Sequence, residues 1–139
     1  LSLLLKKIIP TIDNPQDVKT IIPEKLPTIY GDNHRLETLF YNLIHNAIKF
    51  NDKGKNGFIE INYFDQKDFW KFTLKDNGKG IENKYFDKIF VAFQKLENDH
   101  KSTGIGLSIV KKIIEAYNGD ICIESTPNVE TIFTFTIKK

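Results

Sequence analysis

Two asparagines and a lysine recur at helical spacing in the first half of the chain. Asn42 and Asn46 stand four residues apart and Lys49 follows three residues later, so an α-helix places all three side chains on one side. This row lies beside the apolar stripe of the same helix, where the floor of a cleft is expected. Amide oxygens suit Mg²⁺, which takes few protein ligands beside waters and phosphates. Taken alone the triple fits a solvated helix flank better, although two asparagines inside a helix need a reason.

A carboxylate ends an inward-facing row of apolar side chains. Trp70, Phe72 and Leu74 alternate with polar residues and face the core of the expected strand, and Asp76 continues their row. A buried carboxylate needs hydrogen-bond donors, and the exocyclic amine of a purine supplies them. The alternative is an aspartate that begins a turn, because Asp-Asn-Gly is a strong turn sequence. On spacing alone both interpretations stay open.

Glycines punctuate two later segments, at Gly78 and Gly80 and at Gly104 and Gly106. Neither pair fits a P-loop, because no glycine lies five residues ahead of a Gly-Lys pair. The third glycine of the dinucleotide-binding fingerprint is also absent, and Ile109 stands in its place. The second pair leads into an expected helix, whose N-terminal N–H groups attract phosphate. An ordinary loop is the plain alternative.

Two amphipathic helices are expected to position these residues. The first begins after Asp32, a suitable N-cap, and ends before Asn51. Its apolar stripe consists of Leu36, Leu39, Phe40, Leu43, Ala47 and Phe50. The second spans residues 105–117, with Gly119 at the place of a C-terminal glycine. Its buried face consists of Ile109, Val110, Ile113 and Tyr117.

Strand patterns fill most of the remaining chain. They are expected at residues 58–64, 69–75, 120–124 and 131–137, with a possible edge strand at 18–22 and an apolar helical run at 1–9. Helices followed by hairpins predict an α+β fold, a two-layer sandwich of a mostly antiparallel sheet covered on one face by helices.

Composition narrows the class of protein. With 139 residues, 40% of them hydrophobic, the chain fits a single domain over residues 1–139. The lone Cys122 excludes an internal disulfide and favours a reducing, cytoplasmic setting. With His34, His45 and His100 it has no metal-site spacing, and a net charge of +2 gives no argument for nucleic acid. The start at Leu1 suggests a piece of a longer chain.

Together, in order and at these separations, the motifs resemble the four nucleotide-binding boxes of sensor histidine kinases, members of the GHKL superfamily with the Bergerat fold. Residues 42–50 resemble the N box and residues 76–81 the first glycine box. Residues 89–94 resemble the F box and residues 102–108 the second glycine box. Each box alone is a weak indication of nucleotide binding. All four in the same order and spacing favour nucleotide binding over the non-functional interpretation of each motif.

The resemblance implies three helices on a mixed sheet, with ATP held between a helix and a lid at residues 83–103. By it, Asn46 coordinates Mg²⁺, Asn42 supports the phosphate site and Lys49 contacts phosphate. Asp76 accepts the adenine amine. The further ATP-binding residues that the resemblance implies are Gly78, Gly80, Ile81, Phe93, Thr103, Gly104, Ile105, Gly106 and Leu107. The resemblance also implies that Phe90 and Phe93 anchor the lid, whereas the turn at 127–130 departs from the family pattern because it lacks glycines.

One position distinguishes kinases from their hydrolysing relatives. Gyrase, mismatch-repair ATPases and heat-shock chaperones carry a glutamate, the general base, where this chain has Asn42. An amide cannot accept a proton at neutral pH, so transfer to an external imidazole is expected instead of hydrolysis. His45 points away from the apolar stripe and is expected to be exposed and not catalytic. No His-Glu or His-Asp pair followed by proline is present, so the phosphoacceptor helix is missing.

The expected function is therefore that of a protein histidine kinase fragment in a two-component phosphorelay, with ATP and Mg²⁺ as cofactors and no autophosphorylation on its own. The expected partners are the histidine phosphoacceptor (dimerisation) domain of the parent kinase and, indirectly, a response regulator. Neither nucleic acid nor direct membrane contact is expected, and the fragment is expected to be monomeric. Two alternatives remain: a degenerate nucleotide-binding docking module and a serine kinase of the anti-sigma-factor type.

Overall fold

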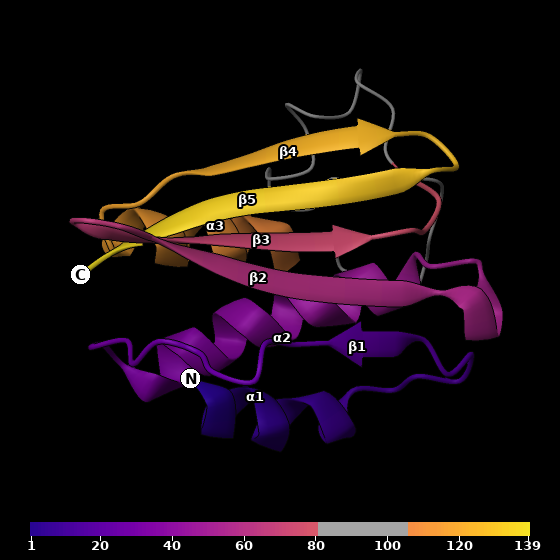
Figure 1. The fold of residues 1–139 in the computed structure, drawn as a ribbon, viewed down its shortest axis with the longest axis horizontal. Coiled ribbons are helices and arrows are strands. Elements are labelled where there is room, and N and C mark those ends of the chain that lie inside the picture. Colours follow the sequence, from indigo (N-terminus) through magenta and orange to yellow (C-terminus); the bar gives the residue numbers. More distant parts are fainter. Residues whose placement is uncertain (81–105) are drawn as a thin grey trace.

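A five-stranded sheet lies against helices in the computed structural model, which describes residues 1–80 and 106–139 (Figure 1). The strands are β1 (Lys19–Ile21), β2 (Phe58–Gln66), β3 (Phe69–Asp76), β4 (Ile121–Thr126) and β5 (Glu130–Lys138). Their order is β1-β2-β3-β5-β4, with β1 parallel to β2 and every other pair antiparallel. The helices are α1 (Ser2–Ile8), α2 (Asn33–Lys49) and α3 (Gly106–Ala116), with short 3₁₀ turns η1 (Ile9–Thr11) and η2 (Gly54–Asn56). The predicted α+β sandwich with a mixed sheet and three helices is confirmed.

A tight turn joins the two strands of each hairpin, β2 to β3 and β4 to β5. Lys67 between β2 and β3 has φ 62°, and its N–H donates to Asp65 Oδ1 at 3.2 Å. Between β4 and β5, Asn128 has φ 64°. Asparagine tolerates this left-handed conformation better than most residues, which explains how the turn at 127–130 forms without glycine.

The N-cap and the buried face of α2 agree with the sequence prediction. The N-cap Asp32 accepts a hydrogen bond from His34 N–H at 2.9 Å. Five of the six predicted stripe residues are buried, whereas Phe50 at the C-cap is only partly buried. Ile44 and Ile48 are buried as well, because the helix packs on two sides, against the sheet and against α3.

α3 differs from its prediction at its buried face and at its end. Ile114 is fully buried, whereas the predicted Ile109 and Tyr117 are only partly so. The left-handed residue after the helix is Asn118, with φ 57°, and Gly119 N–H donates to Ile114 O at 3.0 Å. Gly119 is required for another reason, since a Cβ there would collide with the backbone oxygen of Thr136 on β5.

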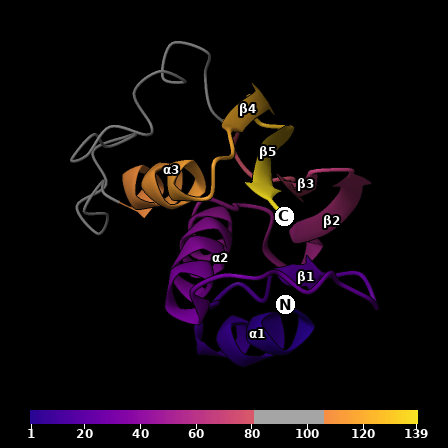
Figure 2. The ribbon, with the colours of Figure 1, turned by 90° about the vertical axis from the view of Figure 1, so that its left-hand side faces the viewer.

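α1 and the edge strand β1 complete the sandwich at one end, where Figure 2 shows α1 beneath β1. Leu5 and Ile8 are buried, and the Lys7 ammonium lies 2.9 Å from the Glu37 carboxylate on α2. Before β1, the amide of Asn14 makes two 2.9 Å hydrogen bonds to the backbone of Val18. The helix predicted at residues 1–9 and the edge strand predicted at 18–22 are confirmed.

Three phenylalanines join α2 to the sheet at the centre of the core. Phe40 meets Phe72 and Phe135 edge-on, with ring centroids 5.7 and 5.8 Å apart, and Phe72 stacks on Phe135 at 5.2 Å. All three side chains are fully buried. None of the helices in the described part of the chain is long and apolar enough to cross a membrane.

Candidate functional site

Asp76 ends β3 on the inner face of the sheet, as its place in the alternating row predicts. It is 6% exposed, and its Oδ1 accepts a hydrogen bond from Gly78 N–H at 2.9 Å. Burial raises the pKa of this carboxyl to about 6, the Gly78 hydrogen bond acts in the opposite direction, and the charge of Glu130 adds to the rise. Within residues 1–80 and 106–139, Gly78 is its only hydrogen-bond partner. The site therefore presents a buried acceptor with capacity for another donor.

Polar side chains extend the row of Asp76 across the sheet. Strand register places Thr131 of β5 opposite Asp76 and Ser125 of β4 opposite Thr131. Thr131 is 4% exposed, and its hydroxyl lies 3.0 Å from that of Ser125. None of the sequence motifs predicts a role for Thr131 or Ser125. The available signal was alternation, because Thr131 starts the inward row that Phe133 and Phe135 continue.

The glycine box after Asp76 is held between α2 and the β4–β5 turn. A Cβ on Gly78 would lie 2.8 Å from Phe50 O. Gly80 has φ 74°, and a Cβ there would lie 2.5 Å from Thr126 O. Lys79 N–H donates to Phe50 O at 3.3 Å, and Lys79 O accepts from Asn128 N–H. The observed close approach is to protein backbone, so contact of these glycines with a base stays a prediction.

Asn77 fixes the same segment through its side chain. Its Oδ1 accepts from Asn51 Nδ2 at 3.0 Å and from Phe58 N–H at 2.8 Å, and its Nδ2 donates to Asn56 O at 3.0 Å. Asn51 is 3% exposed. From the sequence, Asn51 is expected only to end α2, and Asn77 only to form part of the glycine box. Their pairing joins the C-terminus of α2 to the loop that follows Asp76.

The predicted row on α2 lies at the margin of the core. Asn42, Asn46 and Lys49 are all partly buried. Asn42 Nδ2 donates to Thr38 O at 2.7 Å, and among residues 1–80 and 106–139 its Oδ1 has no hydrogen-bond donor, so it is the acceptor or ligand atom that the amide offers. His45, expected to be exposed, is instead partly buried, because its ring stacks on Tyr41 with centroids 5.6 Å apart.

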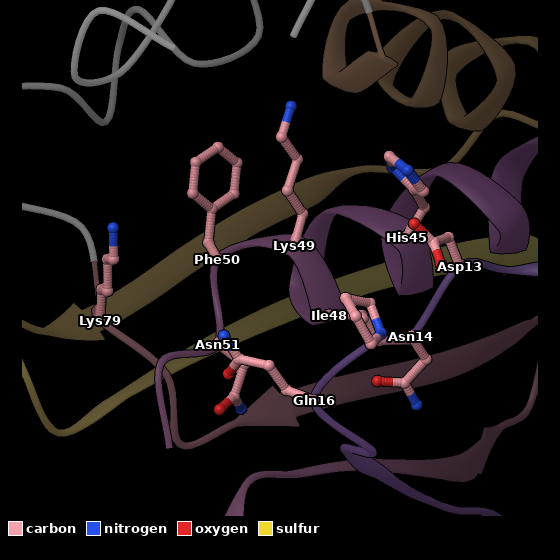
Figure 3. A pocket seen from close by; sticks show the side chains of 10 residues that line it. Asp13, Asn14, Gln16, His45, Ile48, Lys49, Phe50, Asn51 and Lys79 are labelled. Atoms are coloured by element: carbon pink, nitrogen blue, oxygen red, sulfur yellow. The ribbon is translucent and has the colours of Figure 1, made fainter. Parts of the chain in front are cut away.

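A pocket of about 510 Å³ opens at the C-terminal end of α2 (Figure 3). In this view the side chains of Lys49, Phe50 and Lys79 extend toward the same side. The lining residues are Asp13, Asn14, Pro15, Gln16, His45, Ile48, Lys49, Phe50, Asn51 and Lys79. The pocket therefore brings cations from α2 and from the glycine box to one place.

Not all predicted residues gather there. Asn42 lines a second pocket, of about 300 Å³, together with Lys7 and Glu37 from α1 and α2. Asp76 and Asn46 line neither of these two pockets. Gly106 begins α3, and Leu107 packs into the core at 9% exposure. The predicted ATP-binding residues Ile81, Phe93, Thr103, Gly104 and Ile105, and the lid with Phe90, lie outside the described residues.

The described residues fit a nucleotide with a magnesium ion. A nucleotide bound here would find an acceptor for a base amine in Asp76 and positive charge for its phosphates on Lys49 and Lys79. No group of three His, Cys, Asp or Glu side chains in the described part of the chain is placed to hold a metal ion. A magnesium ion would then depend on amide oxygens, waters and phosphate oxygens, since Mg²⁺ beside a nucleotide keeps several waters and takes few protein ligands.

An α+β sandwich with a buried acceptor at the end of a strand and cations at the end of the facing helix has the architecture of a nucleotide-binding domain. Comparison with known proteins narrows this class. The family model described as histidine kinase-, DNA gyrase B- and HSP90-like ATPase matches residues 31–139. The chain belongs to this family, which confirms the predicted relationship.

The curated relatives that the chain matches are several times longer than it is. It is 44% identical over 115 residues to the phytochrome-like protein Cph1 of Synechocystis, covering 81% of this chain and 15% of that protein. It is 36% identical over 144 residues to the heme sensor protein HssS of Staphylococcus saprophyticus, covering 100% of this chain and 30% of the relative. The chain thus spans less than a third of the length of either relative.

Solved structures share the fold. The mycobacterial sensor histidine kinase MprB has a TM-score of 0.82 at 17% identity, over 99% of this chain and 91% of that one. The catalytic domain of histidine kinase ThkA has a TM-score of 0.75 at 28% identity, over 99% and 86% of the two chains.

Proposed function

We propose that this chain binds ATP with Mg²⁺ and transfers the γ-phosphoryl group to a histidine on a separate phosphoacceptor domain, as the catalytic domain of a sensor histidine kinase. The observation that carries this proposal is the state of Asn42. Its amide nitrogen is bound to the Thr38 carbonyl, so the side chain offers an oxygen but no basic group. A water molecule would find no general base at this position, whereas an imidazole nucleophile needs none there.

The other residues divide the work of holding the nucleotide. Asp76 accepts the exocyclic amine of adenine, and Lys49 meets phosphate charge. Asn46 coordinates Mg²⁺ together with phosphate oxygens, and the bound ion neutralises charge that develops on the transferred group. Catalysis then consists of positioning and charge stabilisation.

The relatives support transfer over hydrolysis. One is the adaptive-response sensory kinase SasA of Nostoc, 37% identical over 127 residues, covering 88% of this chain. The structure at 28% identity is also the catalytic domain of a histidine kinase. We propose that residues 1–139 form one monomeric domain, located in the cytoplasm, whose phosphoacceptor domain passes the phosphoryl group to a response regulator.

A transfer assay tests this function. The chain is incubated with γ-labelled ATP, Mg²⁺ and the phosphoacceptor domain of the full-length kinase, and both labelled histidine and free phosphate are measured. We expect acid-labile label on the histidine of the acceptor, lost in Asn46→Ala and retained in Asn62→Ala, a matched change at an exposed position of β2. Release of free phosphate without labelled histidine would identify a hydrolase. The absence of both labelled histidine and free phosphate would identify a docking module.

A further inference from the structure

Two hydroxyl groups continue the row of Asp76, and we propose that Ser125 is a positioning residue that selects the group at the 6-position of the bound purine. It would do so by fixing the direction of the Thr131 hydroxyl hydrogen. This inference rests on the proposed function, because it needs a purine at Asp76.

The three side chains are neighbours on one face of the sheet. Asp76 faces Thr131 across β3 and β5, and Thr131 faces Ser125 across β5 and β4. Side chains directly opposite in antiparallel strands have Cβ atoms about 4.5–5.5 Å apart. Asp76 and Thr131 are both buried, at 6% and 4% exposure. A base amine bound to the carboxylate therefore lies within reach of the Thr131 hydroxyl.

The hydrogen bonds define which hydroxyl donates. Ser125 Oγ donates to Glu130 O at 2.9 Å, since a carbonyl oxygen can only accept. A hydroxyl has one hydrogen, and with the Ser125 hydrogen directed at Glu130 O we assign Thr131 as the donor in the 3.0 Å contact between Ser125 Oγ and Thr131 Oγ1. Thr131 then has only lone pairs left for any other partner. Within the described residues its side chain makes no hydrogen bond to Asp76.

This arrangement distinguishes purines that a carboxylate alone does not. Adenine carries an amine at the 6-position, and hypoxanthine carries an oxygen there with an N–H at the neighbouring N1. Asp76 can accept from the amine of the first or from the N–H of the second. A Thr131 fixed as an acceptor favours the amine and repels the oxygen, because two lone pairs then face each other. Ser125 itself stays one strand away from the base and acts through Thr131.

Calorimetric titration with ATP and with inosine triphosphate, both with Mg²⁺, tests the assignment. We expect the native chain to bind ATP more tightly. In Ser125→Ala the Thr131 hydroxyl is released and can turn to donate, so the ratio of the two affinities falls by about fivefold, the effect of one hydrogen bond. Ser125→Thr keeps a hydroxyl and should keep the ratio. Thr134→Val, which removes a hydroxyl from the opposite face of β5, is the matched control and should also keep it.

The outcomes separate this inference from the proposed function. No binding of either nucleotide by the native chain contradicts the proposed function and, with it, the inference. Native selectivity for ATP that persists unchanged in a folded Ser125→Ala overturns the inference alone. Thr131→Val removes the acceptor itself at nearly constant shape. It must also lower the ratio, and an unchanged ratio there overturns the inference even if Ser125→Ala fails to fold.

Discussion

At the scale of single residues, Asp76 combines a buried carboxyl group with one protein hydrogen bond. Its pKa lies at about 6 in the folded chain, above the 3.8 that is usual for an aspartate side chain. Between these two values the folded state binds more protons than the unfolded state. The free energy of unfolding contributed by this group therefore rises as pH falls through about 6 and is lowest above it. A ligand that donates a hydrogen bond to the carboxylate would offset the lower stability above pH 6.

Replacing Asp76 with asparagine should stabilise the ligand-free chain. The amide oxygen of Asp76→Asn can still accept from Gly78 N–H, but no charge is buried. We expect the free energy of unfolding at pH 7.5 to rise by about 1–3 kcal/mol, and the gain to shrink toward pH 4. Urea unfolding at both pH values measures it, with Asp68→Asn at an exposed turn as control. A variant less stable than the native chain at pH 7.5 would contradict the view that the buried charge of Asp76 destabilises the ligand-free chain.

Asn77 should contribute to stability through all three of its hydrogen bonds. Asn77→Ala leaves the partner groups on Asn51, Asn56 and Phe58 without their bonds, so we expect a loss of about 2–4 kcal/mol. Asn77→Asp keeps both accepted bonds but turns a carboxylate oxygen toward Asn56 O, so it should recover only part of the loss. Denaturant titration of the two variants gives the comparison. Equal losses would show that the accepted bonds contribute little.

At the scale of elements, patterns of period two and 3.6 predicted α2, α3 and the strands β2, β3, β4 and β5. The helix α1 was expected only from an apolar run and β1 only as a possible edge strand, and the short 3₁₀ turns η1 and η2 were not predicted. The stripe of α2 and its Asp32 cap are local signals, because they depend on residues within one element. The features that escaped prediction depend on partners distant in sequence. Ile114 is buried by packing of α3 against α2, and the parallel pairing of β1 with β2 follows from tertiary placement.

The candidate site shows the same division. The inward position of Asp76 follows from alternation along one strand. Thr131 and Ser125 approach it only through the register of β5 and β4, which the sequence does not state. Asn51 and Asn77 lie 26 residues apart and form their pair only when the loop after β3 meets the end of α2.

The turn between α3 and β4 gives a prediction at this scale. A methyl group at Gly119 collides with the backbone oxygen of Thr136, so Gly119→Ala must separate α3 from β5. We expect its free energy of unfolding to fall by more than about 2 kcal/mol. Gly54→Ala is the matched control, since it has φ 58° but no atom within 4 Å, and should lose only about 1 kcal/mol. Similar losses in both variants would rule out the collision.

At the scale of the whole molecule, the cluster of Phe40, Phe72 and Phe135 joins helix and sheet in one core. We therefore expect the chain to unfold in a single cooperative transition. Fluorescence of Trp70, on β3, reports the sheet, and far-ultraviolet circular dichroism is dominated by the helices. The two signals should have the same midpoint in urea. Separate midpoints would show that the helices and the sheet unfold independently.

Binding of ATP tests the account as a whole most directly, because every proposed role depends on a nucleotide at Asp76. The measurement is calorimetric titration of ATP with Mg²⁺ into the native chain, Asp76→Asn and the control Asp68→Asn at pH 7.5. We predict one site per chain in the native protein and the control, and an affinity at least tenfold lower in Asp76→Asn, since its amide presents a donor to the adenine amine. Equal binding by the native chain and Asp76→Asn, or no binding by the native chain, would contradict the proposed nucleotide site at Asp76.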